Sequence, residues 1–154
     1  MMTAGVELAL RLERDLPAPR SLVFRMHADS DRWRRWWGPD GFSVPSIEVD
    51  LRVGGRYRIE MQPPDGDPFF LTGEFREVEP PARLAYAFAW EDPDPDDQET
   101  VVTFSLEDLG EERTRLVVEQ GPFATEARRA LHTQGWTETL DRLQQLIAEE
   151  IVTR

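Results

Sequence analysis

The sequence predicts an α+β fold in which a curved antiparallel sheet of about seven strands wraps around a long C-terminal helix. Two observations carry this prediction. Apolar residues alternate with polar ones in short segments up to residue 120, and they change to helical spacing after residue 125. Two short helices are expected after the first strand. Residues 1–154 are expected to form one domain, because a chain of this length fits a single core.

The C-terminal helix is predicted over residues 125–152. Thr125 is a suitable N-cap, because its side-chain oxygen can accept a hydrogen bond from the first turn. At ~1.5 Å per residue such a helix is roughly 40 Å long and crosses a small domain. Steps of three and four residues place one apolar stripe on it, formed by Trp136, Leu140, Leu143, Ile147 and Ile151. This stripe needs a sheet to lie on.

The first strand and the two short helices follow from apolar spacing and from helix and strand breakers. Apolar residues alternate from Val6 to Leu12, and Pro17 marks the end of this strand. Apolar residues at helical spacing predict a helix over residues 21–28. A second helix is expected over residues 31–37, where a Gly-Pro pair stops it.

The remaining strands are joined by short segments rich in Gly, Pro and Asp. Because consecutive strands with short turns pair with one another, they should form an antiparallel meander. The last turn is placed at Gly110. The predicted strands cover residues 43–51, 56–61, 69–78, 84–90, 100–106 and 114–120.

Composition excludes several classes of function. The net charge of −12 argues against nucleic acid and anionic membrane, since both need a basic surface. The chain has no Cys and no Lys, which excludes disulfides, thiolate nucleophiles and lysine Schiff bases. No apolar segment suits a signal peptide or a membrane span, so a cytoplasmic location is expected.

No metal, cofactor or catalytic residue is predicted. The two histidines lack paired spacing. The acidic segment 92–99 fails as an EF-hand loop, because Asp97 stands where Gly is needed and Thr103 where Glu is needed. We therefore expect a solvated hairpin loop there.

The common catalytic motifs, G-x-S-x-G, the P-loop, G-x-G-x-x-G and H-E-x-x-H, are absent. The sequence therefore favours a protein without catalysis. An enzyme of the cyclase, hydratase or hydrolase type stays open as an alternative. Its base would be sought among Glu60, Glu74 and Glu119, although strand alternation directs all three to solvent.

Five short motifs, in order, carry a resemblance to a known family. They are Trp33-x-x-Trp36-Trp37-Gly38-Pro39, Asp50-Leu51-Arg52-x-Gly54-Gly55-x-Tyr57, Pro64-Asp65-Gly66 followed by Gly73, Pro80-Pro81-x-Arg83-Leu84, and His132-x-x-Gly135-Trp136. Through them the chain resembles the START-like (helix-grip, SRPBCC) superfamily, and within it homologues of the activator of the ninety-kilodalton heat-shock protein's ATPase. The resemblance implies a cavity between the sheet and the C-terminal helix that often holds an apolar small molecule. It implies no catalytic residues.

The aromatic residues are the candidate ligand contacts. Five tryptophans are many for one small domain, and aromatic rings suit the walls of apolar pockets. Ordinary core packing is the alternative for each of them. The predicted cavity residues are Trp36, Trp37, Tyr57, Ile59, Met61, Phe75, Tyr86, Phe88, Trp90, Phe104, His132, Trp136 and Leu140.

Two residues of the predicted C-terminal helix have two interpretations each. His132 lies at the edge of the apolar stripe and is either a structural hydrogen-bonding residue or a polar anchor for a ligand. Gly135 lies in the helix interior, where glycine costs about 1 kcal/mol relative to alanine. It is either a tolerated defect or the point where a strand or ligand approaches the helix closely.

The sequence thus favours binding of a small hydrophobic molecule, by a monomer or a homodimer. The alternative partner is a chaperone ATPase, contacted through the acidic surface.

Overall fold

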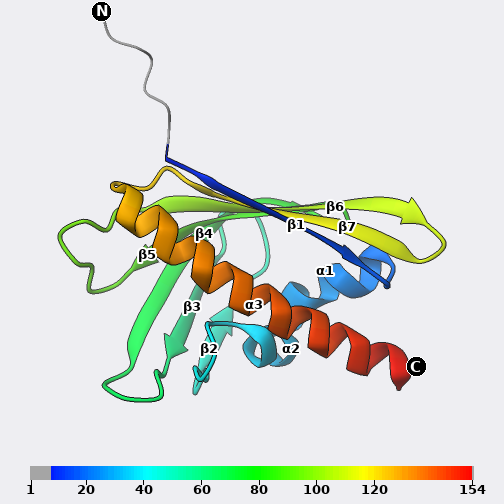
Figure 1. Ribbon diagram of the computed structural model, residues 1–154, viewed down its shortest axis with the longest axis horizontal. Coiled ribbons are helices and arrows are strands. Elements are labelled where there is room, and N and C mark those ends of the chain that lie inside the picture. The colour runs from blue at the N-terminus through cyan, green and yellow to red at the C-terminus, as the bar shows by residue number, and fades with distance from the viewer. Residues whose placement is uncertain (1–7, 154) are drawn as a thin grey trace, which may run out of the picture.

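The fold is a seven-stranded antiparallel sheet that curves around one long helix. This computed structural model describes residues 8–153. Figure 1 shows α3 lying diagonally across the concave side of the sheet, with α1 and α2 beside its C-terminal half. The elements in chain order are β1 Leu10–Leu16, α1 Arg20–Ala28, α2 Ser30–Trp36, β2 Ile47–Val49, β3 Arg56–Met61, β4 Phe69–Glu79, β5 Arg83–Trp90, β6 Thr100–Gly110, β7 Arg113–Gly121 and α3 Glu126–Val152.

The predicted fold class is confirmed. Strands β2 to β7 form the expected meander, and β1 pairs with β7, so the sheet order is β1-β7-β6-β5-β4-β3-β2. The two short helices follow β1 as expected. The first and last strands of the sequence therefore meet, and the sheet ends at β2 on its other side.

The boundaries of the first predicted strand were wrong. The strand begins at Leu10, after Leu8, and continues to Leu16. Val6 lies outside the described residues. The extension has a simple cause: residues 10–16 pair with residues 114–120 of β7 without interruption, and Pro17 then removes the next backbone donor.

The predicted strand over residues 43–51 was too long. Only Ile47–Val49 forms β2, and Ser43 makes an isolated bridge to Gln62. Pro45 lies between these two segments, and a proline cannot donate to a strand ladder. Edge strands tolerate such interruptions, which explains why β2 is short.

The last hairpin turns one residue later than predicted. Gly110 still pairs with Arg113, and the turn consists of Glu111 and Glu112 with φ angles of 55° and 56°. Two-residue hairpins prefer such positive φ angles because they match the twist of the strands. Two glutamates gave no sequence signal for this turn, since Asn and Gly are the residues that favour it.

Helix α3 begins as predicted. The Thr125 side chain accepts a hydrogen bond from the Arg128 backbone N–H at 3.1 Å. The predicted stripe is buried from Trp136 to Ile147, and Ile151 is partly buried. Among residues 8–153, none of the helices is both long and apolar enough to cross a bilayer.

The core beside α1 and α2 is filled by rings that surround His27. The His27 ring is buried and meets Trp33, Trp36 and Phe104 edge-on, with ring centroids 4.7, 5.0 and 4.4 Å away. Its Nε2 is hydrogen-bonded to Oη of Tyr86 at 3.0 Å. Because burial disfavours the charged ring, the pKa of His27 falls from 6.5 to about 3.

This buried histidine predicts acid sensitivity. The unfolded chain takes up a proton on His27 below pH 6.5, whereas the folded chain does not until about pH 3. The free energy of unfolding should therefore fall by ~1.4 kcal/mol per pH unit in this range, about 2 kcal/mol by pH 5. Urea unfolding between pH 7 and pH 5 measures this slope.

The control is His27→Gln, which cannot titrate. This variant should be less stable at pH 7 and should show a flatter profile down to pH 5. Since both proteins share the same carboxylates, an equal slope in the two would contradict the assignment to His27.

Candidate functional site

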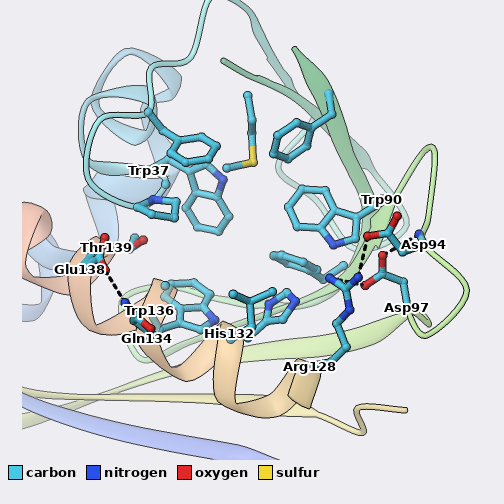
Figure 2. Close-up of a pocket in the computed structure, with 18 of the residues that line it drawn as sticks. Trp37, Trp90, Asp94, Asp97, Arg128, His132, Gln134, Trp136, Glu138 and Thr139 are labelled. Carbon is cyan, nitrogen blue, oxygen red and sulfur yellow. Dashed lines mark hydrogen bonds and ion pairs between the residues drawn. The ribbon is translucent and has the colours of Figure 1, made fainter. Parts of the chain in front are cut away.

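A pocket of about 560 Å³ opens beside the N-terminal half of α3, whereas α1 and α2 lie beside its C-terminal half (Figure 2). Its other walls are the ends of β3, β4 and β5, residues 37–42 after α2, and the loop between β5 and β6. Small-molecule sites usually occupy about 300–1,000 Å³. The pocket is therefore of the right size for one small molecule.

The strand wall is aromatic because alternate residues share a face. Phe88 and Trp90 are two apart on β5, and their ring centroids lie 5.2 Å from each other. Phe69 on β4 pairs with Met61 on β3, and its ring lies 5.2 Å from that of Trp90. Three strands thus build one apolar surface.

The helix wall consists of one face of α3. His132, Gly135, Trp136 and Thr139 are spaced by three, one and three residues and all line the pocket. The indole Nε1 of Trp136 donates to Oε1 of Gln120 on β7 at 2.7 Å, and both side chains are buried. This bond fixes the Trp136 ring, so it does not swing into the pocket.

Arg142 ties the segment after α2 to α3. Its Nη1 donates to the backbone carbonyls of Trp37 at 3.0 Å and Gly38 at 2.9 Å. The backbone N–H of Asp40 donates to Oε1 of Glu138 at 2.9 Å. Two connections to the helix therefore hold this wall apart from the strand wall.

Arg128 ties the loop between β5 and β6 to α3. Its guanidinium lies 2.6 Å from the carboxylate of Asp94, 3.0 Å from Asp96 and 3.3 Å from Asp97. The side chain of Asp97 is only 9% exposed. The expectation of a solvated loop was therefore wrong in part, because these acids bind a cation that lies some 30 residues away in the sequence.

His132 is partly buried among rings. Its ring centroid lies 5.6 Å from that of Phe88 and 5.0 Å from that of Phe123. Burial lowers the pKa of His132 below its ordinary value, and Arg128 adds to this effect while Asp97 opposes it. The imidazole is therefore neutral at neutral pH and presents a polar group inside an apolar wall.

Gly135 leaves open space on the helix wall. A methyl group added at this glycine would meet only the Pro39 ring, at an ordinary contact distance of 3.8 Å. None of the described strands approaches it. Gly73 differs, since a methyl group there would collide with the carbonyl oxygen of Ala87. Packing thus requires glycine at position 73 and does not require it at position 135.

The structure divides the predicted cavity residues into two groups. The pocket is lined by Trp37, Met61, Phe88, Trp90, His132 and Trp136. The others are at most 3% exposed and lie in the filled core, away from the pocket: Trp36, Tyr57, Ile59, Phe75, Tyr86, Phe104 and Leu140. They are buried as predicted, but His27 of α1 and Trp33 of α2 fill the space in front of the strand rings among them.

Several pocket residues were not predicted. Leu131 is 57% exposed although it is large and apolar, and Phe69 and Phe70 begin β4 at the pocket wall. The sequence offered one signal of an exposed apolar wall: Leu131 is apolar although it lies outside the buried stripe of the helix, where a polar residue is expected. Pro39 and Phe42 gave no signal, since their position depends on how the segment after α2 folds back onto α3.

The remaining titratable candidates lie elsewhere. Glu60 and Glu74 are half-exposed, Glu119 is exposed, and none of the three lines the pocket. Within the described part of the chain, no three side chains of His, Asp or Glu are placed to hold a metal ion.

Comparisons with known proteins place this fold among related chains. A family model described as "Activator of Hsp90 ATPase homolog 1-like protein" matches residues 17–148. Protein NE0264 from Nitrosomonas europaea is 28% identical, with a TM-score of 0.80 over 96% of this chain and 99% of that one. Protein CV1439 from Chromobacterium violaceum is 27% identical, with a TM-score of 0.79 over 90% and 96%. The AHSA1 protein SPO3351 from Silicibacter pomeroyi is 28% identical, with a TM-score of 0.80 over 92% and 99%. No curated protein sequence matches the chain.

The open space at Gly135 predicts a stabilising substitution. Gly135→Ala should raise the free energy of unfolding by about 1 kcal/mol, because alanine favours the helix and meets no close neighbour. Gly73→Ala should destabilise the fold strongly, since the added methyl group displaces backbone. Urea unfolding of the two variants beside the wild type checks both expectations. A loss of stability in Gly135→Ala would show that packing does demand this glycine.

Proposed function

The chain belongs to the family of activator of Hsp90 ATPase homolog 1-like proteins, and on this premise we propose that it is a cytoplasmic binding protein for a small apolar or amphipathic molecule. The molecule would lie in the pocket between α3 and the sheet. The observation that carries the proposal is that the pocket stays open between walls that are held in place. Trp136 is fixed by Gln120, and Arg142 fixes the opposite segment.

Three features of the pocket support a bound molecule. Its aromatic wall offers apolar surface whose burial would drive binding. Leu131 exposes apolar surface on the helix side of the pocket, which an occupant would cover. Gly135 widens the pocket at a cost to helix stability that the fold itself does not require.

The polar groups suit orientation of the molecule. His132 is a neutral hydrogen-bonding group within the apolar wall, and acidic side chains gather at the loop between β5 and β6. An amphipathic molecule would place its apolar body against the rings and its polar end toward this loop.

The family description supports a second candidate, a contact with a chaperone ATPase. The acidic surface of a chain with net charge −12 would carry such a contact. Adding the protein to a purified chaperone should then change its ATP turnover, and high salt should remove the change. An unaltered turnover at low salt would count against this candidate.

Native mass spectrometry of the freshly purified protein tests the first candidate. A bound molecule should appear as a mass excess that vanishes on denaturation, and the excess gives its mass. Since a weak ligand is lost during purification, the absence of an excess has to be followed by direct binding of a probe.

The probe experiment uses 2-isopropylnaphthalene, a small apolar molecule. The wild type should bind it in equilibrium dialysis, and Gly135→Leu should weaken binding at least tenfold because the leucine side chain would project into the pocket and take up space that the probe needs. The matched control is Ala148→Leu, an exposed site on α3 outside the pocket wall, which should bind like the wild type. Equal binding by both leucine variants would place the probe elsewhere and contradict the proposal.

A further inference from the structure

Trp37 carries a buried hydrogen-bond donor that has no acceptor among residues 8–153. The side chain is 3% exposed. Other indoles in the core are satisfied: Nε1 of Trp36 donates to the Met26 carbonyl at 3.0 Å, and Nε1 of Trp136 donates to Gln120 at 2.7 Å. A buried donor without an acceptor destabilises a fold, so its persistence here requires an explanation.

The position of Trp37 supplies that explanation. Trp37 lines the pocket, and Figure 2 shows its indole projecting toward the pocket interior. Met61 lines the same pocket, and its unbranched side chain can shift to admit an acceptor. Trp33 also lacks an acceptor, but its ring packs against Tyr57 and Tyr86 in the filled core and lines no pocket. Nε1 of Trp37 is itself buried at the pocket wall, so an acceptor reaches it from the pocket once neighbouring side chains shift, whereas Trp33 has no pocket beside it.

The charges on the pocket wall restrict the occupant further. Four carboxylates and one guanidinium give the wall a formal charge of −3: Asp92, Asp94, Asp97, Glu138 and Arg128. The guanidinium already binds three aspartates, and the imidazole of His132 is neutral. A negatively charged ligand would therefore meet repulsion without an available cation on this wall.

We propose that the occupant is an uncharged molecule with a carbonyl oxygen in its apolar body, such as an aromatic or alicyclic ketone or ester, and that this oxygen accepts a hydrogen bond from Nε1 of Trp37. The inference rests on the proposed binding function. It adds that the pocket selects for an internal acceptor and against carboxylates.

Three naphthalene probes of similar size separate these properties. 2-Acetylnaphthalene has the carbonyl, 2-isopropylnaphthalene has the same shape without an acceptor, and 2-naphthoate is an anion. Equilibrium dialysis gives the affinity of each for the wild type, Trp37→Phe and the matched control Trp33→Phe. Both substitutions remove a buried indole, so the informative quantity is the ratio of ketone to hydrocarbon affinity within one protein.

This ratio should fall about tenfold in Trp37→Phe, as expected for the loss of one hydrogen bond. It should stay at the wild-type value in Trp33→Phe. The wild type should bind 2-naphthoate at least tenfold more weakly than 2-acetylnaphthalene. A ratio that is the same in Trp37→Phe and in the wild type overturns the inference, and so does equal affinity for the anion.

The failure of the inference and that of the proposed function are distinguishable. If 2-isopropylnaphthalene binds and Gly135→Leu blocks it, the binding function stands whatever the ratio does in Trp37→Phe. If none of the three probes binds the wild type, both are overturned.

Discussion

The structure depends on the burial of one face of α3 against the concave side of the sheet. The buried bond from Trp136 to Gln120 links this helix to β7. The two halves of the contact differ. Beside the C-terminal half, α1 and α2 bring rings that fill the space around His27. Beside the N-terminal half none of the helices among residues 8–153 intervenes, and the pocket remains.

Arginines hold the open half in shape. A chain without lysine uses Arg142 to bind backbone carbonyls after α2 and Arg128 to gather three aspartates of one loop. The guanidinium group suits both tasks, because its fork of donors can contact several oxygens at once. These contacts keep the two walls apart without filling the space between them, which is what a binding site requires.

The sequence predicted the periodic parts of the fold and missed the parts that depend on distant contacts. The stripe of α3, the strand faces and the cap at Thr125 follow from local spacing, and all were confirmed. Alternation also showed that residues such as Tyr86 and Phe88 point inward. It could not show that the first lies in filled core and the second in the pocket, since that depends on where α1 and α2 dock. The bonds of Arg128 and Arg142 were missed for the same reason.

The central claim is that side chains fill one half of the space between α3 and the sheet, and that the other half receives a ligand. Fluorine NMR tests this claim most directly. The five tryptophans, labelled as 5-fluorotryptophan and assigned by single Trp→Phe variants, report on both halves. On addition of 2-acetylnaphthalene, the signals of Trp37, Trp90 and Trp136 should shift most, because their rings line the pocket. The signals of Trp33 and Trp36 should stay in place. Shifts centred on Trp33 and Trp36, or equal shifts of all five, would contradict the account.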